Sequence, residues 1–327
     1  MAKRPKLPVR TKQLAIGKDP CQVYLDTLKE SGCRSMGIML TRVSELYGYK
    51  DIQCMPWEHI RFEHLGWIKS TLQKVKSDQD KEYSQRSINM AIYAARGVSK
   101  AAYNLGLITI DDLTKINDVK PIKITRLPAG RAVDGDEFSA LLAVCMDDER
   151  SAGARDLAII NCLYVAGLRR SEAAKLTLDN FIVRKDKKTK ARQAKFHFFG
   201  KGDVEAFCHL DSEALSAVDN WIVERGPSPG PLFCSITKGG KVNTQRHMSE
   251  QSIYNIVRSR SQQAGIPLIS PHDMRRSLAT HLLNEKNVPI KRVQNIMRHA
   301  DIRTTAIYVR DDEDENRKAI NGLRSNN

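Results

Sequence analysis

The stretch SPHDMRRSLATHLL, residues 270–283, combines the signals of a well-capped helix with a cationic face. Its first turn carries a capping residue, a proline and a negative charge, all of which favour a helix start: Ser270, Pro271 and Asp273. Apolar residues recur at steps of four and predict a buried stripe: Met274, Leu278 and Leu282. His272 and Arg275 lie three residues apart and therefore share the neighbouring face. An imidazole and a guanidinium held together near a helix amino end favour a phosphate-binding site.

Three further segments carry basic, imidazole or phenol side chains at helix ends or in tight turns. In LYVAGLRRSEAAKL, Gly167 stops an apolar helix and Arg169 lies where the next helix begins. An arginine at the junction of two core helices needs a partner for its charge. In FGKGDVEAF, Lys201 lies between two glycines in a tight turn, which is by itself a weak signal because such turns often hold lysine for solubility. In IMRHADIRTTAIYVR, His299 closes one helix and Tyr308 lies in the next.

Composition narrows the class of protein. The 327 residues are 41% hydrophobic and 28% charged, which is typical of a globular chain large enough for two domains. Lys and Arg outnumber Asp and Glu by 53 to 38, and the net charge of +15 favours an anionic partner, with nucleic acid ahead of a membrane surface. Seven scattered cysteines without a CxxC pair indicate a reducing compartment. No signal peptide and no run of roughly 18 apolar residues is found. We expect a cytoplasmic protein, or a nuclear one if the host has a nucleus, with no membrane partner.

Changes in periodicity predict the domain organisation. Residues 1–18 form a basic amino-terminal arm. Residues 19–108 carry four amphipathic patterns with short connections, which predict a small helical bundle. Residues 109–133 contain two prolines and no sustained period, which is typical of a linker. Residues 134–327 form a second, larger domain that ends in a tail.

The second domain is predicted to be mainly α with a small antiparallel sheet, an α+β arrangement. The apolar run GARDLAIINCLYVAG predicts a central helix. After Leu178 the period changes to two and indicates three short strands: FIVRKD, AKFHFF and VEAFCHL. Helices then resume to the end of the chain, at about 211–225, 249–264, 271–286, 289–297 and 302–310.

Taken in order, these motifs resemble those of the tyrosine recombinase, or phage integrase, family. The motifs are Gly167-Leu168-Arg169-x-Ser171-Glu172, Gly200-Lys201-Gly202, His272-x-x-Arg275, His299-Ala300 and Thr304-Thr305-x-x-Tyr308. Each motif alone is common, whereas all of them in this order are specific. The resemblance covers essentially the whole chain, because the first bundle is similar to the family's SAM-like core-binding domain. It implies a C-shaped clamp around double-stranded DNA and a site-specific recombinase of the integrase or transposase type.

The resemblance also implies roles for six residues. Arg169 and Arg275 would clamp the scissile phosphate, and Lys201 would protonate the leaving 5′ oxygen. His272 would act as acid or base, and His299 would hydrogen-bond the phosphate. The nucleophile would be Tyr308, which would form a 3′-phosphotyrosyl intermediate.

The chemistry explains these residue types. In-line attack concentrates negative charge on the equatorial phosphate oxygens, which guanidinium forks meet in bidentate geometry. Tyrosine, with an ordinary pKa of about 10, needs a cationic, desolvated site to attack at neutral pH. The covalent intermediate keeps the energy of the broken bond, so that rejoining requires neither ATP nor a metal ion. The sequence shows no P-loop, no clustered acidic ligands of a two-metal nuclease and no zinc-ligand spacing, and we expect no cofactor and no metal.

Two positions depart from the family pattern. Arg276 follows Arg275 where the family commonly has histidine, and an extra phosphate contact is one role for it. Met297-Arg298-His299 stands where Leu-Gly-His is usual, which places a long cation at a position typical of glycine.

Contacts to DNA are predicted from polarity alone, on the helix that begins near Ser84, in the linker, and in the segment RHMSEQSIYNIVRSRS. The candidates are Gln85, Arg86, Asn89, Arg126, Arg131, Arg246, Arg258 and Arg276. Five of the nine tyrosines fall on apolar stripes and are predicted to be core: Tyr24, Tyr93, Tyr103, Tyr164 and Tyr254.

The family resemblance implies a homo-tetramer on two DNA sites, held by docking of the carboxyl-terminal tail onto the next protomer, with accessory DNA-binding factors as possible partners. A solvated tail is the alternative. Two other functions stay open. One is a type IB topoisomerase-like enzyme that relaxes DNA, and the other is a non-catalytic, architectural DNA-binding protein.

Overall fold

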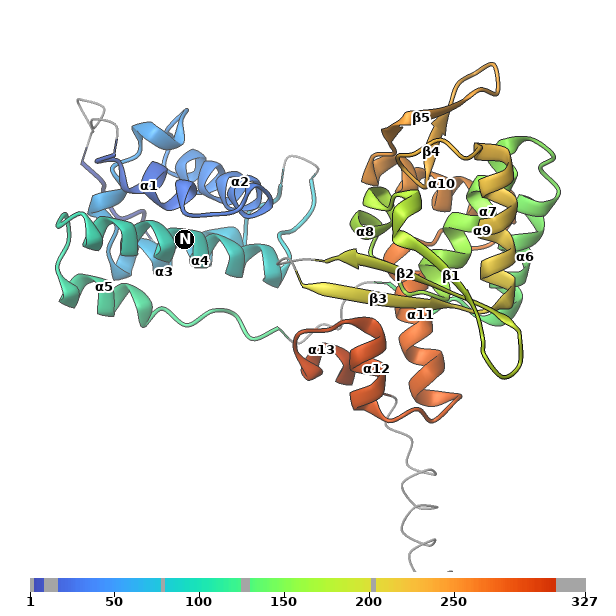
Figure 1. Ribbon diagram of the computed structural model, residues 1–327. Coiled ribbons are helices and arrows are strands. Elements are labelled where there is room, and N and C mark those ends of the chain that lie inside the picture. Colours follow the sequence, from blue (N-terminus) through green and yellow to red (C-terminus); the bar gives the residue numbers. More distant parts are fainter. Residues whose placement is uncertain (1–2, 9–16, 78–79, 125–129, 201–203, 310–327) are drawn as a thin grey trace, which may run out of the picture. The chain divides into compact units, whose positions relative to one another are not determined.

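The computed structural model describes residues 3–8, 17–77, 80–124, 130–200 and 204–309 and divides the chain into two compact units, Met1–Leu127 and Pro128–Asn327 (Figure 1). Both units are mainly helical, and the only sheets in the described residues are small and antiparallel. The predicted fold class is confirmed. None of the described helices combines the length and the apolarity needed to cross a bilayer.

The first unit is built around a long helix, α4 (Gln85–Asn104), which contacts each of the other helices of the unit. These helices are α1 (Pro20–Asp26), α2 (Glu30–Leu46), α3 (Phe62–Leu72) and α5 (Ile110–Asn117), with short 3-10 turns at Ile52–Cys54 and Trp57–His59. Ser84 caps α4 by accepting a hydrogen bond from the backbone N of Ser87 at 3.1 Å. Alanines and β-branched residues along α4 are buried and allow the neighbouring helices to approach closely: Ala91, Ile92, Ala94, Ala95 and Val98.

Helix α5 corrects the prediction of a linker over residues 109–133. Thr109 caps it, and Leu113 and Ile116 are buried in the core of the first unit. The Arg96 side chain also donates to the backbone O of Asn117, which ties the end of α5 to α4. The helix has only two turns and two buried positions, too few to establish a period in the sequence.

The close approach of Tyr24 to α4 at Gly97 gives a stability prediction. A Cβ at position 97 would lie 2.2 Å from the Tyr24 ring, whereas a Cβ at Gly66, in α3, would meet nothing within 4 Å. We expect Gly97→Ala to lower the free energy of unfolding by about 1–3 kcal/mol. Gly66→Ala is the matched control and is expected to raise it by about 0.5–1 kcal/mol. Chemical denaturation of the full-length chain measures both, and equal effects would contradict this packing.

The second unit contains eight α-helices and a short 3-10 turn, Leu178–Asn180, among its described residues. The α-helices are α6 (Gly135–Met146), α7 (Ser151–Tyr164), α8 (Arg170–Lys175), α9 (Ser212–Arg225), α10 (Glu250–Gln263), α11 (Pro271–Asn284), α12 (Ile290–Met297) and α13 (Ile302–Ala306). Helix α7 is central, as predicted, and contacts α6, α9 and α11. Helices α11, α12 and α13 pack in sequence at one end of the unit (Figure 1). The predicted helix from 302 to 310 ends earlier, at Ala306.

Three strands form one antiparallel sheet in the order β1-β2-β3, at Phe181–Lys185, Arg192–Phe199 and Glu205–Leu210. These are the predicted strands. The sequence analysis missed a second hairpin, β4 (Cys234–Ile236) with β5 (Val242–His247). Strand β5 has the sequence VNTQRH and is largely exposed, so that it lacks the apolar alternation on which strand prediction depends.

Candidate active site

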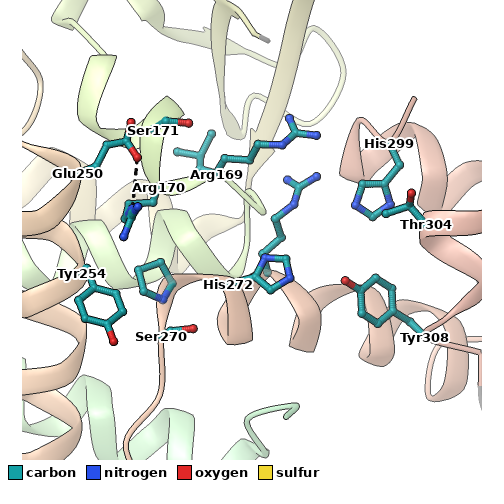
Figure 2. Close-up of a pocket in the computed structure, with 13 residues that line it drawn as sticks. Arg169, Arg170, Ser171, Glu250, Tyr254, Ser270, His272, His299, Thr304 and Tyr308 are labelled. Carbon is teal, nitrogen blue, oxygen red and sulfur yellow. Dashed lines mark hydrogen bonds and ion pairs between the residues drawn. The ribbon is translucent and has the colours of Figure 1, made fainter. Parts of the chain in front are cut away.

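A cavity of about 510 Å³ in the second unit brings together side chains from the α7–α8 turn, α10, α11 and the α12–α13 region (Figure 2). Five of the six residues predicted to be catalytic line it: Arg169, His272, Arg275, His299 and Tyr308. They come from distant parts of the chain, and α11 supplies two of them. Its predicted cap is present, since the hydroxyl of Ser270 accepts from the backbone N of Asp273 and the Asp273 carboxylate accepts from the backbone N of Ser270.

Arg275 lines the cavity and is only 3% exposed. Its guanidinium donates to the backbone O of Gly167 and to the backbone O of Met297. These bonds join α11 to the turn between α7 and α8 and to the end of α12. Burial, together with the positive charges of Arg298 and Arg169, lowers the pKa of Arg275 to about 9. The group therefore stays protonated at neutral pH, in a place where an anion would relieve the repulsion among cations.

Arg169 immediately precedes α8. Its positive charge is paired with Glu172, as expected for an arginine between two core helices. Its Nη1 donates to Glu172 Oε1 at 2.5 Å and its Nη2 donates to the backbone O of Arg298 at 3.0 Å. Burial raises the pKa of the Glu172 carboxyl, but the charge of Arg298 and the hydrogen bonds from Arg169 outweigh this effect, so that the pKa lies below its ordinary value. Glu172 is thus a buried carboxylate between two arginines.

Both histidines of the site are neutral at pH 7. Burial lowers the pKa of His299 to about 4, with further lowering by Arg275 and Arg169. The ring is oriented by its Nδ1, which lies 2.9 Å from the Thr305 hydroxyl. Burial within the site, followed by the charges of Arg276 and Arg275, also lowers the pKa of His272.

Tyr308 follows α13, and its side chain is part of a small apolar cluster. The residue is 8% exposed, and its ring packs with Leu278, Ala279, Val293 and Met297. Its centroid lies 6.4 Å from that of the His299 ring, and the guanidinium of Arg276 lies 5.6 Å over its face. Figure 2 shows the hydroxyl directed into the cavity toward His272. The phenol is therefore fixed by packing, with its hydroxyl oxygen directed into the cavity.

The lowered pKa of His299 gives a prediction for stability against pH. Its ordinary value is 6.5, so the unfolded chain binds a proton on this ring at a higher pH than the folded chain does. The free energy of unfolding should fall as the pH drops through the window from about 6.5 to about 4. We expect His299→Asn, which cannot take up this proton, to show a shallower fall over the same window. Thermal melts of the two proteins from pH 4 to 7 measure the difference, and parallel curves would contradict the shift.

Lys201 lies outside the described residues. The residues on either side of that turn, Gly200 and Val204, line a second cavity of about 410 Å³ together with Arg169 and His299. Gly200 and Val204 therefore share a cavity with two of the predicted site residues. Within the described part of the chain, no three His, Cys, Asp or Glu side chains are grouped as metal ligands.

Of the predicted DNA-contact residues, Asn89 requires correction. It is 5% exposed, and its amide forms a pair of hydrogen bonds with the backbone of Ile122, at 2.8 Å and 2.7 Å. It stabilises the first unit and is not available to bases. Arg86 and Arg246 are exposed, Gln85 is partly buried, and Arg126 lies outside the described residues.

Three predicted contact residues have protein partners near the site. Arg131 pairs with Glu137 and donates to the backbone O of Pro267 at 3.2 Å. Arg276 donates to the backbone O of Gly130, and its guanidinium also lies over the ring of Tyr308. Arg258 donates to the Tyr254 hydroxyl at 3.3 Å. These contacts hold all three guanidinium groups in defined positions.

The prediction that Tyr254 is a core residue was wrong. Its ring lies at the edge of the active-site cavity, with the guanidinium of Arg170 at 5.8 Å and that of Arg258 at 5.6 Å (Figure 2). Tyr93 and Tyr103, also predicted to be core, are 48% and 39% exposed. Helical spacing identifies one face of a helix but does not tell how far that face is buried at its margins.

Comparison with known proteins identifies the family. The profile of the phage integrase family matches residues 131–315. Tyrosine recombinase XerD of Mycobacterium leprae is 32% identical over 231 residues, which are 67% of this chain and 67% of that protein. Tyrosine recombinase XerD of Pseudomonas aeruginosa is 28% identical over 252 residues, which are 75% of this chain and 74% of that protein.

Solved structures share the fold. The XerH site-specific recombinase bound to difH substrate, in a pre-cleavage complex, has a TM-score of 0.65 at 17% identity and covers 95% of this chain and 85% of that chain. The Tn1549 transposon integrase in complex with transposon right end DNA has a TM-score of 0.61 at 16% identity, and the match covers 93% of this chain and 99% of that chain. The chain belongs to the phage integrase family: it is a tyrosine recombinase, and its activity is site-specific DNA recombination by cleavage and rejoining of strands. The family predicted from the motifs is confirmed.

Proposed function

We propose that Tyr308 is the nucleophile of strand cleavage and that it forms a 3′-phosphotyrosyl intermediate with release of a 5′ hydroxyl. The observation that carries this proposal is the single cavity in which Tyr308 meets Arg169, His272, Arg275 and His299. The phenol hydroxyl is directed toward His272, and the ring lies 6.4 Å from that of His299 and 5.6 Å from the guanidinium of Arg276 (Figure 2). Arg169 and Arg275 would clamp the non-bridging oxygens, with charge-assisted hydrogen bonds that strengthen as negative charge develops.

The histidines have different roles in this proposal. His272 is neutral and lies where the Tyr308 hydroxyl points, so it would accept the phenolic proton as attack begins. His299 is held by Thr305 and would donate a hydrogen bond to the phosphate. Neutral imidazoles can serve in these roles at pH 7, whereas a protonated His272 could not act as the base.

Lys201 would protonate the leaving 5′ oxygen, because an ammonium group with an ordinary pKa near 10.4 carries its proton at neutral pH. A 5′-bridging phosphorothioate tests this role, since a thiolate leaves without protonation. We expect Lys201→Ala to cleave the ordinary substrate slowly and the sulfur substrate at the wild-type rate. An equal defect on both substrates would assign Lys201 to phosphate binding instead.

The central experiment uses a site selected from a pool of randomised duplexes with the full-length chain. A nicked version of that site loses the short 5′-hydroxyl fragment after cleavage, which traps the covalent complex. We expect an adduct whose tryptic phosphopeptide contains Tyr308. Absence of any adduct would favour the architectural alternative. Relaxation of supercoiled DNA without exchange between two sites would favour the topoisomerase-like alternative.

For the assembly, we propose that both units contact double-stranded DNA and that four copies join on two sites through the tail. Residues 310–327 of the tail lie outside the described residues. A solved relative is named as a lambda integrase dimer bound to a COC' core site, which supports oligomerisation on DNA in this fold. Analytical ultracentrifugation measures the mass of the complex that the full-length chain forms with DNA carrying two sites. A chain that ends at Val309 is expected to form a smaller complex if the tail joins the copies. All seven cysteines are free thiols, which favours a reducing location such as the cytoplasm.

A further inference from the structure

Arg298 occupies a backbone conformation that ordinarily selects glycine. It ends α12 with φ 53° and ψ 44°, in the left-handed region, where a Cβ atom is unfavourable. The side chain nevertheless turns inward, and only 12% of it is exposed. A strained backbone that carries a buried charged group indicates that the side chain has a specific task.

The guanidinium of Arg298 reaches from the end of α12 to the turn between α7 and α8. Its Nη2 donates to the backbone O of Gly167 at 2.8 Å and to Glu172 Oε2 at 3.0 Å. Its Nη1 donates to the backbone O of Ile296 at 3.0 Å, with the backbone O of Ala166 at 3.4 Å, and the group lies 5.8 Å over the ring of Phe198. One residue thus connects two of the segments that form the active-site cavity.

Arg298 shares its acceptors with both of the arginines that face the cavity. The backbone O of Gly167 accepts from Arg298 and also from Arg275. Glu172 accepts from Arg298 and also from the backbone and side chain of Arg169. In return, Arg169 donates to the backbone O of Arg298 at 3.0 Å. Arg298 itself is not among the residues that line that cavity.

We propose that Arg298 is a positioning residue for strand cleavage, which fixes Gly167 and Glu172 so that Arg275 and Arg169 present their donors to the phosphate. The inference rests on the proposed roles of those two arginines. It also has an electrostatic part. With Arg298 present, Glu172 is shared between two guanidinium groups and leaves Arg169 with net positive charge for a phosphate. Without Arg298, Glu172 and Arg169 would neutralise each other.

The test compares Arg298→Gly, Arg298→Lys and a control, Lys187→Ala, which removes one positive charge from the exposed turn between β1 and β2. Glycine suits the left-handed backbone, so a defect in that variant reports the loss of the side chain and not a distorted chain. Lysine keeps the charge but cannot reproduce the fork of donors. For each protein we would measure the single-turnover cleavage rate at saturating selected duplex, the dissociation constant and the melting temperature.

We expect Arg298→Gly to cleave about 100-fold more slowly at saturation, because a small misplacement of catalytic groups has an effect of this size. Its affinity for the duplex should stay within about threefold, since many other phosphate contacts determine binding. Arg298→Lys should recover part of the rate, and Lys187→Ala should match the wild type.

Several outcomes would overturn the proposal. One is cleavage by Arg298→Gly within about threefold of the wild-type rate, and another is a loss confined to affinity. If Arg298→Gly fails to fold, Arg298→Lys decides: slow cleavage at a wild-type melting temperature supports positioning, and a wild-type rate refutes it. A wild-type chain that forms no adduct would overturn the proposed function itself, which is a distinct result.

Discussion

Tyr308→Phe is expected to abolish the covalent complex with nicked duplex and to leave DNA binding intact. Without the phenol oxygen, the proposed phosphotyrosyl bond cannot form, so cleavage should fall by at least about 10⁵-fold. Phenylalanine keeps the ring in contact with Leu278 and Met297 and beneath the guanidinium of Arg276, so the melting temperature should not change by more than about 2 °C. Denaturing gels measure the adduct, and a gel-shift titration measures affinity.

Tyr254→Phe is the matched control, because Tyr254 lines the same cavity and its hydroxyl accepts only a long hydrogen bond, 3.3 Å, from Arg258 in the interactions described. This variant should cleave within about threefold of the wild type. The assignment of the nucleophile would be wrong if Tyr308→Phe still formed an adduct, or if Tyr254→Phe were the variant that lost it.

Arg275→Ala is expected to have the second largest effect, on both activity and stability. The loss of a guanidinium from a phosphoryl-transfer site should slow cleavage by about 10³-fold or more. The backbone O of Met297 would also lose its buried donor, at a cost of about 1–3 kcal/mol, whereas the backbone O of Gly167 would keep the donor from Arg298. Single-turnover kinetics and urea denaturation measure the two effects separately.

Arg275→Lys separates charge from geometry. It keeps the positive charge, but its donors lie on one nitrogen and cannot reproduce the planar fork that spans the two carbonyls and faces the cavity, so we expect a rate that remains at least about 10²-fold below the wild type. Arg303→Lys is the control, since the Arg303 side chain is 88% exposed and pairs with Asp301. Full activity of Arg275→Lys would show that charge alone is sufficient at this position.

The parts of the site that follow helical spacing could be predicted from the sequence. The i, i+3 spacing of His272 and Arg275 places both side chains on one face, and the apolar stripe of α11 fixes the direction of that face. That Arg169 needs a buried partner also follows from its position between two apolar helices, and Glu172 supplies that partner. These inferences depend on local geometry, which a sequence determines well.

The remainder depends on contacts between distant segments, which a sequence does not encode in its local pattern. Arg298 is recognisable as unusual at its position, but nothing in its neighbours indicates that its side chain reaches Gly167 and Glu172. Asn89 has the polarity of a DNA contact, and only the position of Ile122 reveals its structural role. Helix α5 and the β4–β5 hairpin were missed because short elements bury too few residues to produce a period.

The placement of Tyr308 beside Arg169 and Arg275 of its own polypeptide has a consequence for mixed assemblies. Under the roles proposed above, each copy would bring its own phenol and its own two guanidinium groups to the break, so a copy that lacks its phenol would not be restored by a neighbour that lacks its guanidinium groups. Co-expression of two such defective copies should therefore yield no genetic complementation. Under the same proposal, each strand that is cut in an assembly would be attributed to the subunit bound at that break, and the order of cutting would depend on which subunit is active.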